Sequence, residues 1–307
     1  MSGTAFTGLV GCRLPLQLAG MGGVGADPAL PAAVSAAGGL GMLGAAGLSP
    51  DRLAAVLAEL TALTPAPYGV NFLIPGLDRD SVEVAATGSP FVEFFYGDPE
   101  PALVDLVHRG GALACWQVGS REEAQRAVEV GCDVVVVQGT EAGGHVRGIQ
   151  PLQELLDLVL PVIDVPVLAA GGIGTAAQVC ALIDTGASGV RVGTRFLAAE
   201  ESFAHPDYVA ALIAAQDGDT VLTDVFRVGW DAPHRVLRSA TQALAASAEE
   251  VTATVNGGPV PRGATAPPTR AMQGNIAAMA LYAGTGVTDV RQRQPAADII
   301  GALCAAL

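Results

Sequence analysis

Short apolar runs alternate with longer amphipathic stretches along most of the chain, beginning at Leu16. The four consecutive valines at 134–137 are typical of a strand buried on both faces, as in a parallel sheet. We expect strands at 16–19, 41–43, 68–73, 91–95, 113–118, 134–138, 167–170 and 190–192. Eight strands alternating with helices close a (β/α)8 barrel, so the pattern predicts an α/β fold of the TIM barrel type.

The stretches between these strands carry signals for helix starts and stops. Ser49 precedes Pro50, a residue suited to the first helical position, and Ser120 with Glu123 matches a capping box. Thr175 precedes apolar residues at helical spacing, which end at a glycine. Helices are therefore predicted between successive strands.

An open, doubly wound sheet is the alternative fold. It normally carries a GxGxxG fingerprint at its first strand-to-helix turn. The turn after Leu18 reads Ala-Gly-Met-Gly-Gly instead. The barrel is therefore preferred.

The alternation ends after Ala215. A possible strand pair, a helix-like stretch at 239–250 and a Gly- and Pro-rich stretch follow, and helical patterns return at 276–282 and 296–307. We expect a barrel at 1–216, a lid or substrate-binding excursion at 217–269, and C-terminal helices at 270–307 that pack back on the barrel.

The composition narrows the function. The chain has 307 residues, is half apolar and only 15% charged, and carries a formal net charge of -14, as a globular enzyme would. All 16 basic residues are arginine. Schiff-base aldolases, pyridoxal-phosphate enzymes and P-loop NTPases need a lysine and are excluded. The acidic balance also argues against a nucleic-acid partner.

Five cysteines are scattered without a CxxC pair, which suits free thiols in a reducing cytoplasm better than disulfides or a zinc site. Residues 1–13 lack the pattern of a signal peptide, and the longest apolar stretches are broken by Gly, Pro or charge. We expect a cytoplasmic protein without a membrane partner or a bound metal.

Glycines follow the seventh and eighth predicted strands, where barrels of this type bind phosphate. Residues 170–174 read Ala-Gly-Gly-Ile-Gly, and Gly193 with Thr194 follows the eighth strand. Glycine lets backbone N–H groups approach a phosphate, and the Thr194 hydroxyl adds a donor. A tight turn alone is the alternative explanation, but two such turns on these strands favour a phosphate site. Without lysine, this site suits a bound cofactor such as flavin mononucleotide (FMN).

Asn71, Gln117 and Gln138 carry planar amides that can pair with the edge of a flavin ring. Their alternative role is to tie down a loop.

His145 is the outstanding titratable residue. It follows a Gly-Gly pair after the sixth strand, where a flexible backbone can project an imidazole into a pocket. We expect a general base or a hydrogen-bond donor to the substrate, the alternative being a histidine that anchors a loop. Glu141 is expected to be an orienting or structural carboxylate.

Several motifs occur together in this chain. Residues 138–145 read Gln-Gly-Thr-Glu-Ala-Gly-Gly-His, 169–173 read Ala-Ala-Gly-Gly-Ile, and 189–196 read Gly-Val-Arg-Val-Gly-Thr-Arg-Phe. Gly-rich segments at 18–23, 36–41 and 282–286 complete the set. Together they resemble the nitronate monooxygenase family, formerly called 2-nitropropane dioxygenases, from about Leu14 to Ala215.

The resemblance implies that the barrel holds non-covalent FMN, with its phosphate on the turns after the seventh and eighth strands. His145 matches the active-site histidine of the family. The cofactor-binding residues expected on this basis are Gly20, Met21, Gly22, Asn71, Gln117, Gln138, Ala142, Gly143, Gly144, Gly171, Gly172, Gly193 and Thr194.

The resemblance also implies a reaction. Alkyl nitronates, or nitroalkanes, would be oxidised with O2 to a carbonyl compound and nitrite, and His145 would deprotonate a neutral nitroalkane. An imidazole with a pKa near neutrality suits that step.

Two alternatives remain. Flavin-dependent enoyl-thioester reductases bear a similar Glu-Ala-Gly-Gly-His stretch, so a reductase of an enoyl thioester or activated alkene, with NAD(P)H as reductant, is the second hypothesis. A flavin-storing or scaffold protein is the third. Many FMN barrels place a lysine near the N1/O2 edge of the flavin; here Gln117 or an arginine would have to replace it. The sequence leaves the oligomeric state open.

Overall fold

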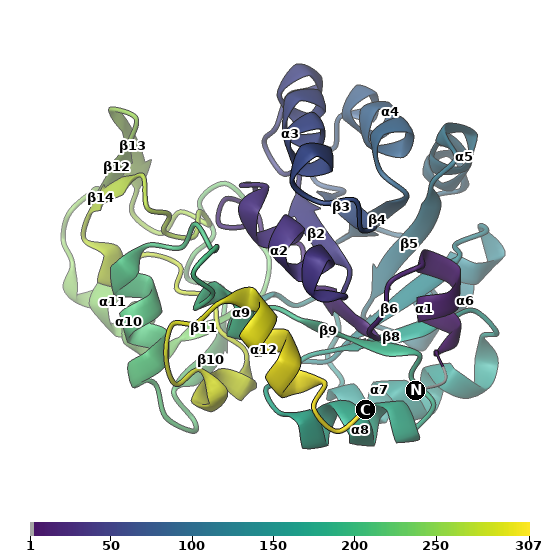
Figure 1. Cartoon of the computed structure of the whole chain (residues 1–307). Coiled ribbons are helices and arrows are strands. Elements are labelled where there is room, and N and C mark those ends of the chain that lie inside the picture. The colour runs from purple at the N-terminus through teal and green to yellow at the C-terminus, as the bar shows by residue number, and fades with distance from the viewer. Residues whose placement is uncertain (1–2) are drawn as a thin grey trace.

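The computed structural model describes residues 3–307, which form a barrel of eight parallel strands surrounded by helices (Figure 1). The strands are β1 (Leu16–Leu18), β2 (Gly41–Gly44), β3 (Tyr68–Leu73), β4 (Phe91–Phe95), β5 (Leu113–Val118), β6 (Val134–Gln138), β8 (Val167–Ala170) and β9 (Gly189–Val192). Each overlaps one of the predicted runs. The predicted (β/α)8 fold is confirmed.

The barrel closes between its first two strands. The strand order is β1-β9-β8-β6-β5-β4-β3-β2. Leu18 N donates to Leu40 O at 2.9 Å, and Leu40 N donates to Leu16 O at 2.8 Å, which joins the two ends of this order. The valines of β6 are fully buried, as expected for a strand covered on both faces.

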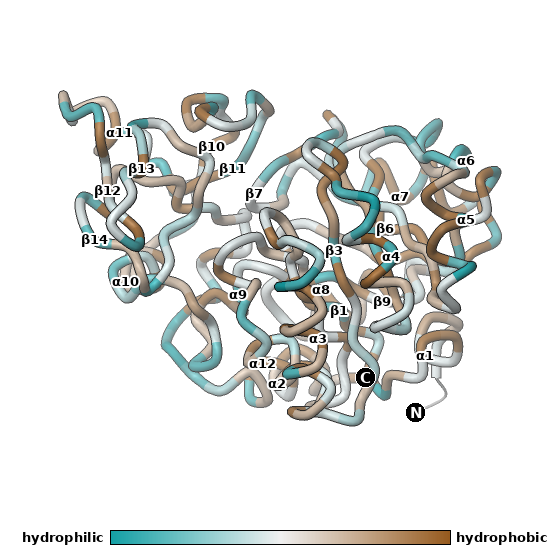
Figure 2. Tube along the Cα trace, turned by 90° about the horizontal axis from the view of Figure 1, so that it is seen from above, coloured by the Kyte–Doolittle hydropathy of each residue, from teal (hydrophilic) through white to brown (hydrophobic). Residues whose placement is uncertain are grey.

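Helices cover the outside of the barrel and begin where the capping signals predict. Ser49 and Ser120 each accept a hydrogen bond from the backbone N–H of the third residue of the helix that follows, at 3.3 and 3.1 Å. Thr175 forms a full capping box with Gln178. The helices of this part are α1 (Ala5–Val10), α2 (Ala29–Ala37), α3 (Pro50–Leu63), α4 (Arg79–Gly88), α5 (Pro101–Gly110), α6 (Arg121–Glu129), α7 (Leu152–Val159), η1 (Leu160–Val162), α8 (Ala176–Asp184), α9 (Thr194–Leu197) and α12 (Ala296–Leu303). In Figure 2, hydrophobic stretches run through helices such as α5 and give way to hydrophilic turns.

None of the helices within residues 3–307 has the length and hydrophobicity that a bilayer-spanning helix needs.

A second part lies beside the barrel (Figure 1). It contains α10 (Pro206–Ala214), β10 (Thr220–Thr223), β11 (His234–Leu237), α11 (Arg238–Ala246), β12 (Val251–Val255), β13 (Gly258–Pro261), β14 (Met272–Gly274), η2 (Ile276–Ala278) and η3 (Thr285–Asp289). One small sheet has the order β10-β11-β7, where β7 (Gly144–His145) follows barrel strand β6. His145 pairs with His234 in this sheet, so the predicted site histidine joins the two parts.

The prediction of a helix at 276–282 is wrong. Only the 3-10 turn η2 forms, and the chain then runs extended, with Leu237 N donating to Leu281 O at 2.8 Å. Met279, Ala280 and Leu281 are all buried, so apolar residues occur here without helical spacing because this segment is covered on every side. Helix α11 covers the first part of the predicted stretch 239–250 and ends at Ala246.

The proposed division at 216 and 269 stays a prediction. Helix α10, before the first boundary, packs in a hydrophobic cluster with β11 and α11 through Tyr208, Val209 and Leu212. Helix α12 packs back on barrel helix α2.

Candidate active site

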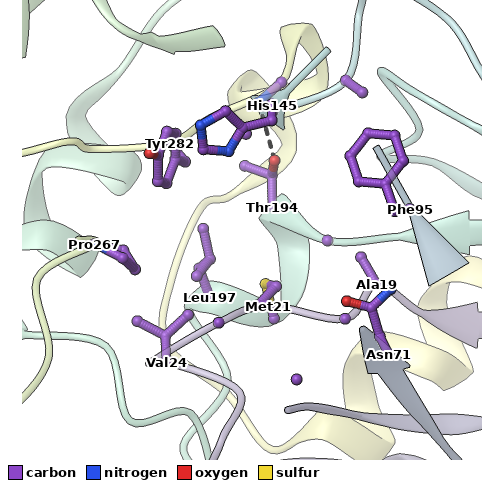
Figure 3. A pocket seen from close by; sticks show the side chains of 18 of the residues that line it. Ala19, Met21, Val24, Asn71, Phe95, His145, Thr194, Leu197, Pro267 and Tyr282 are labelled. Carbon is purple, nitrogen blue, oxygen red and sulfur yellow. Dashed lines mark hydrogen bonds between the residues drawn. The ribbon is translucent and has the colours of Figure 1, made fainter. Parts of the chain in front are cut away.

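A cavity of about 410 Å³ lies at the carboxyl ends of the barrel strands and is lined by both parts of the chain (Figure 3). This volume is typical of small-molecule sites. Every residue that the sequence predicted for the site lines it: Gly20, Met21, Gly22, Asn71, Gln117, Gln138, Ala142, Gly143, Gly144, His145, Gly171, Gly172, Gly193 and Thr194. Their binding of a cofactor remains a proposal.

The glycine turns after β8 and β9 form part of the cavity wall. Gly171 and Gly172 have φ angles of 132° and 69°, a backbone conformation that other residues rarely adopt. A Cβ on Gly172 would lie 2.7 Å from Thr285 Oγ1, so no larger side chain fits. Thr194 Oγ1 accepts a hydrogen bond from Gly284 N at 3.0 Å, which leaves its hydroxyl hydrogen free to donate. These turns offer neutral donors to a ligand.

Two of the amides that line the cavity, those of Asn71 and Gln138, are held by the protein. Asn71 Nδ2 donates to Glu93 Oε1 at 2.6 Å, and Gln138 Nε2 donates to the backbone oxygen of His145 at 3.0 Å. Gln138 therefore does tie down the loop of the histidine. Its Oε1 atom is buried and has no hydrogen-bond partner within residues 3–307, so it is open to a donor from a ligand.

Aromatic rings surround His145. Trp230 stacks on its imidazole, with ring centroids 3.8 Å apart and an angle of 28° between the planes. The rings of Tyr282, His234 and Tyr96 lie at 5.6, 5.5 and 6.1 Å. His145 Nε2 is buried and has no partner among the described residues. His145, Trp230 and Tyr282 all line the cavity, so this unpartnered atom belongs to a side chain of the cavity wall.

Burial, and to a smaller extent the nearby His234, lower the pKa of His145 to about 3. The expectation of a pKa near neutrality is therefore wrong for the free protein. Its physical cause is the enclosure by rings, which removes the water that would solvate an imidazolium. His145 is neutral throughout the physiological pH range.

His234 has a structural role. Phe226 N donates to its Nε2 at 3.3 Å, so its Nδ1 carries the proton and donates to Ala232 O at 2.8 Å. Burial lowers the pKa of this imidazole as well. His234 thus stays neutral and holds the loop that carries Trp230.

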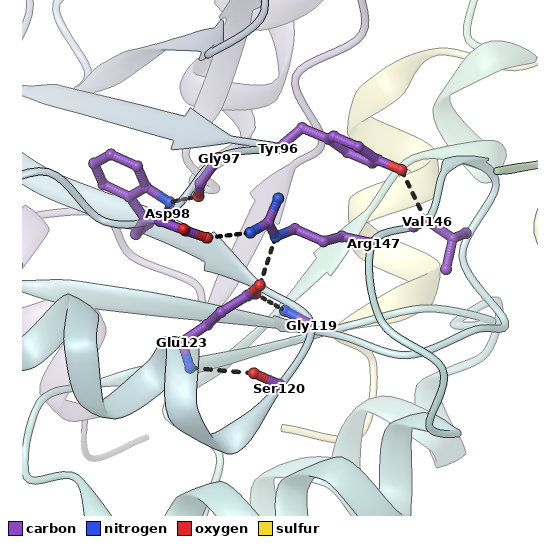
Figure 4. Close-up of polar contacts among 9 residues, drawn as sticks. Tyr96, Gly97, Asp98, Gly119, Ser120, Glu123, Val146 and Arg147 are labelled. Carbon is purple, nitrogen blue, oxygen red and sulfur yellow. Dashed lines mark hydrogen bonds and ion pairs between the residues drawn. The ribbon is translucent and has the colours of Figure 1, made fainter. Parts of the chain in front are cut away.

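Arg147 fastens the chain that follows His145 (Figure 4). Its Nε donates to Glu123 Oε1 at 2.6 Å and its Nη2 to Asp98 Oδ1 at 2.5 Å. Tyr96, one residue before Gly97, donates its hydroxyl to Val146 O at 3.4 Å. The loop after β4, the start of α6 and the segment after β7 are joined in this way.

Sequence reasoning missed several cavity residues. Trp230 lies in the loop between β10 and β11. Gly284 directly precedes η3, and Gly286 lies in it. Only the resemblance of the Gly-rich segment 282–286 to the family pointed to these two glycines. Arg191, which lines the cavity, and its partner Glu93, which does not, were also missed inside barrel strands. Their signal is a single charge in an otherwise apolar run.

Two other expectations agree with the structure. Glu141 accepts hydrogen bonds from Leu152 N, at 2.9 and 3.1 Å, and so supports the start of α7 rather than the cavity. Cys115 and Cys132 pack in the barrel core, where burial raises their thiol pKa values.

A family model described as nitronate monooxygenase matches residues 4–82 and 77–306. A curated "Probable nitronate monooxygenase" of Staphylococcus saprophyticus is 33% identical over 270 residues, which cover 72% of this chain and 76% of that protein.

Another curated relative, from Mycobacterium tuberculosis, is named (3aS,4S,5R,7aS)-5-hydroxy-7a-methyl-1-oxo-octahydro-1H-indene-4-carboxyl-CoA dehydrogenase. It is 36% identical over 242 residues, which cover 77% of this chain and 66% of that protein. The chain thus spans about two thirds of the length of this relative.

Two solved structures resemble nearly the whole chain. FabK from Thermotoga maritima has a TM-score of 0.80 at 29% sequence identity, and the match covers 99% of this chain and 95% of the FabK chain. A nitroalkane oxidase from Streptomyces ansochromogenes has a TM-score of 0.78 at 28% identity, covering 98% and 97%.

Proposed function

Because the chain belongs to the nitronate monooxygenase family and is therefore an oxidoreductase, we propose that it oxidises alkyl nitronates with O2, with FMN as its cofactor. The products would be a carbonyl compound and nitrite. The observation that carries this proposal is the buried Nε2 of His145, which has no partner among the described residues, in a cavity that glycine turns also line.

The cavity residues fit FMN. Backbone N–H groups at Gly171, Gly172 and Gly193 and the hydroxyl of Thr194 would hold the phosphate, as neutral donors do at such turns. The free Oε1 of Gln138 would accept from a ring N–H. When bound, FMN would supply electron transfer from the substrate to O2.

The low pKa of His145 bears on which substrate form is used. An imidazole with a pKa of about 3 is a weak base and is poorly suited to remove a proton from a neutral nitroalkane. A nitronate is already deprotonated, and its negative charge would raise the pKa of an adjacent imidazole. We therefore assign His145 the second of its two expected roles, a hydrogen-bond donor to the substrate.

The rings around His145 would exclude water from this contact. Trp230 covers one face of the imidazole, and Tyr282 closes the same side of the cavity. In such an environment a charged hydrogen bond is stronger than in water.

Anaerobic titration tests the proposal. Purified protein should show the visible absorbance of a bound flavin, and an alkyl nitronate added without O2 should bleach it. Admission of O2 should restore the absorbance and release nitrite. Bound flavin that no nitronate concentration reduces would exclude this function.

A reductase acting on an enoyl thioester or activated alkene is the second candidate. What favours it is the relative named a carboxyl-CoA dehydrogenase, because that name describes a redox reaction on a thioester. A neutral His145 could donate a hydrogen bond to a thioester carbonyl without any change in its protonation.

The same titration separates the candidates. Rapid anaerobic bleaching by NADPH or NADH, and none by nitronate, would favour the reductase. A yellow protein that neither reagent reduces would indicate a flavin-storing protein.

A further inference from the structure

A buried ion pair lies inside the barrel, where side chains are usually branched and apolar. Glu93 of β4 is fully buried, and Arg191 of β9 is 6% exposed. Arg191 Nη1 donates to Glu93 Oε1 at 2.5 Å across the barrel interior. The two strands lie far apart in the strand order, so the pair spans the barrel rather than joining neighbours.

The carboxylate of Glu93 is fully engaged. Besides Arg191, it accepts from Asn71 Nδ2 at 2.6 Å and from Gln17 Nε2 at 3.0 Å. Burial of two charges costs free energy that an apolar pair of similar size would avoid. Stability alone therefore does not account for this network.

Only two of the four side chains in this network line the cavity. Arg191 and Asn71 line it, whereas Glu93 and Gln17 lie behind them. Figure 3 shows the amide of Asn71 close to Ala19 in the cavity wall. Of the two charged residues of the pair, the positive one contributes to the cavity wall and the negative one does not.

Arg191 is the sole basic side chain among the cavity-lining residues of the described chain, apart from the neutral His145. The whole chain has no lysine. A reduced flavin carries negative charge on its pyrimidine edge, and a nearby positive charge favours that state. Among the cavity-lining residues that the structure describes, Arg191 is the one that carries such a charge.

We propose that Arg191, fixed by Glu93, is the positive group that stabilises the reduced flavin and so sets its reduction potential. This inference rests on the proposed function, since it requires FMN in the cavity. Glu93 acts as a positioning residue: it directs the guanidinium of Arg191 and also orients the amide of Asn71. Its charge moderates the positive potential that reaches the cavity.

The test is the two-electron midpoint potential of the holoenzyme, measured against a reference dye during anaerobic photoreduction. The variant Arg191→Met/Glu93→Gln removes both charges and leaves neither partner buried and unpaired. We expect the variant to prefer reduced over oxidised FMN about tenfold less than the wild type does. For a two-electron couple this corresponds to a midpoint potential lower by about 30 mV. Glu93→Gln alone removes only the counter-charge and should shift the potential in the opposite direction.

The control is Arg79→Met/Glu100→Gln, which removes an exposed ion pair with the same donor and acceptor types. Its potential should equal that of the wild type. Midpoint potentials that coincide for the wild type and Arg191→Met/Glu93→Gln, with FMN bound in both, would overturn the inference and leave the proposed function intact. A wild-type protein that binds no FMN would overturn both.

Discussion

His145 is enclosed on several sides by aromatic rings, and this enclosure determines its chemistry. Trp230 stacks on the imidazole, and no described group hydrogen-bonds to Nε2. Desolvation keeps the ring neutral in the free protein. A ligand that brings negative charge or an acceptor atom would therefore gain a strong contact there.

Removal of this contact should impair turnover but not flavin binding. His145→Ala leaves the glycine turns unchanged, so the variant should retain its visible flavin spectrum. Loss of one buried donor should lower kcat/KM for a nitronate about 100-fold. His108→Ala, at an exposed histidine that contacts Asp133, is the control and should keep full activity. Wild-type kcat/KM in His145→Ala would refute the role of His145.

The low pKa of His145 also predicts a pH dependence of stability. An unfolded histidine titrates near pH 6.5, whereas burial lowers the pKa of His145 to about 3. Between these values the unfolded chain binds the extra proton, so the free energy of unfolding contributed by His145 falls as the pH falls. This contribution is fully present above about pH 6.5.

Urea unfolding measures the effect. The midpoint urea concentration should fall between pH 7 and pH 4.5 in the wild type, and it should fall less in His145→Gln, which cannot take up the proton. His234→Gln is not a suitable control, because burial lowers the pKa of His234 too. Identical pH dependence in wild type and His145→Gln would contradict the assigned pKa.

At the scale of elements, the two-residue strand β7 is the part of the structure that positions the site. It pairs with β11 on one side, and Gln138 of β6 holds its backbone from the barrel. After β7, Arg147 connects it to the start of α6 and to the loop after β4 (Figure 4). Three separate elements therefore fix one imidazole.

Arg147→Met should disturb this positioning without unfolding the protein. The variant keeps the aliphatic stem but loses both ion pairs, so Tyr96 and His145 would lose support. We expect kcat to fall about tenfold because small misplacements of a catalytic group are costly. Partly exposed ion pairs contribute only about 0–1 kcal/mol, so the melting temperature should change little.

Flavin content and steady-state kinetics separate these effects. The control is Arg126→Met, which removes an exposed ion pair with Glu129 on the same helix, α6. If Arg147→Met and Arg126→Met had equal kcat, the ion pairs of Arg147 would have no positioning role.

At the scale of the whole molecule, the second part is continuous with the barrel. Its hydrophobic cluster includes Val24 from the loop after β1 and Leu197 from α9, together with Phe226 and Leu237. The pairing of β7 with β11 adds backbone hydrogen bonds. The two parts should therefore unfold together.

The two tryptophans report on this cooperativity, because Trp116 lies in the barrel and Trp230 in the second part. Two single-tryptophan variants, Trp230→Phe and Trp116→Phe, are unfolded in urea. In each variant, the midpoint urea concentration measured by tryptophan fluorescence should equal the midpoint measured by far-UV circular dichroism. Fluorescence and circular dichroism midpoints that differ within either variant would show that the parts unfold independently.

The elements were predictable to different degrees. The eight strands were found because a strand buried on both faces leaves a mostly apolar run. The stretch 276–282 was misread, since a buried extended segment and a buried helix have the same composition when covered on every side. Local pattern distinguishes structures only where one face meets water.

The candidate site followed the same rule. Glycines and His145 were found because they lie just after strands, where the barrel collects strand ends at one edge. Trp230 belongs to a loop with no such landmark, and it reaches His145 through the pairing of β7 with β11. Arg191 and Glu93 carry opposite charges 98 residues apart, and only barrel closure brings them together.

By itself, the sequence determined the barrel, the glycine turns, the histidine of the cavity and the absence of lysine, because each is written in local spacing or composition. Only the tertiary structure decided the protonation state of His145 and the pairing of Glu93 with Arg191 across the barrel. Both depend on which distant side chains exclude water from a group or neutralise its charge, and that is a property of three-dimensional packing.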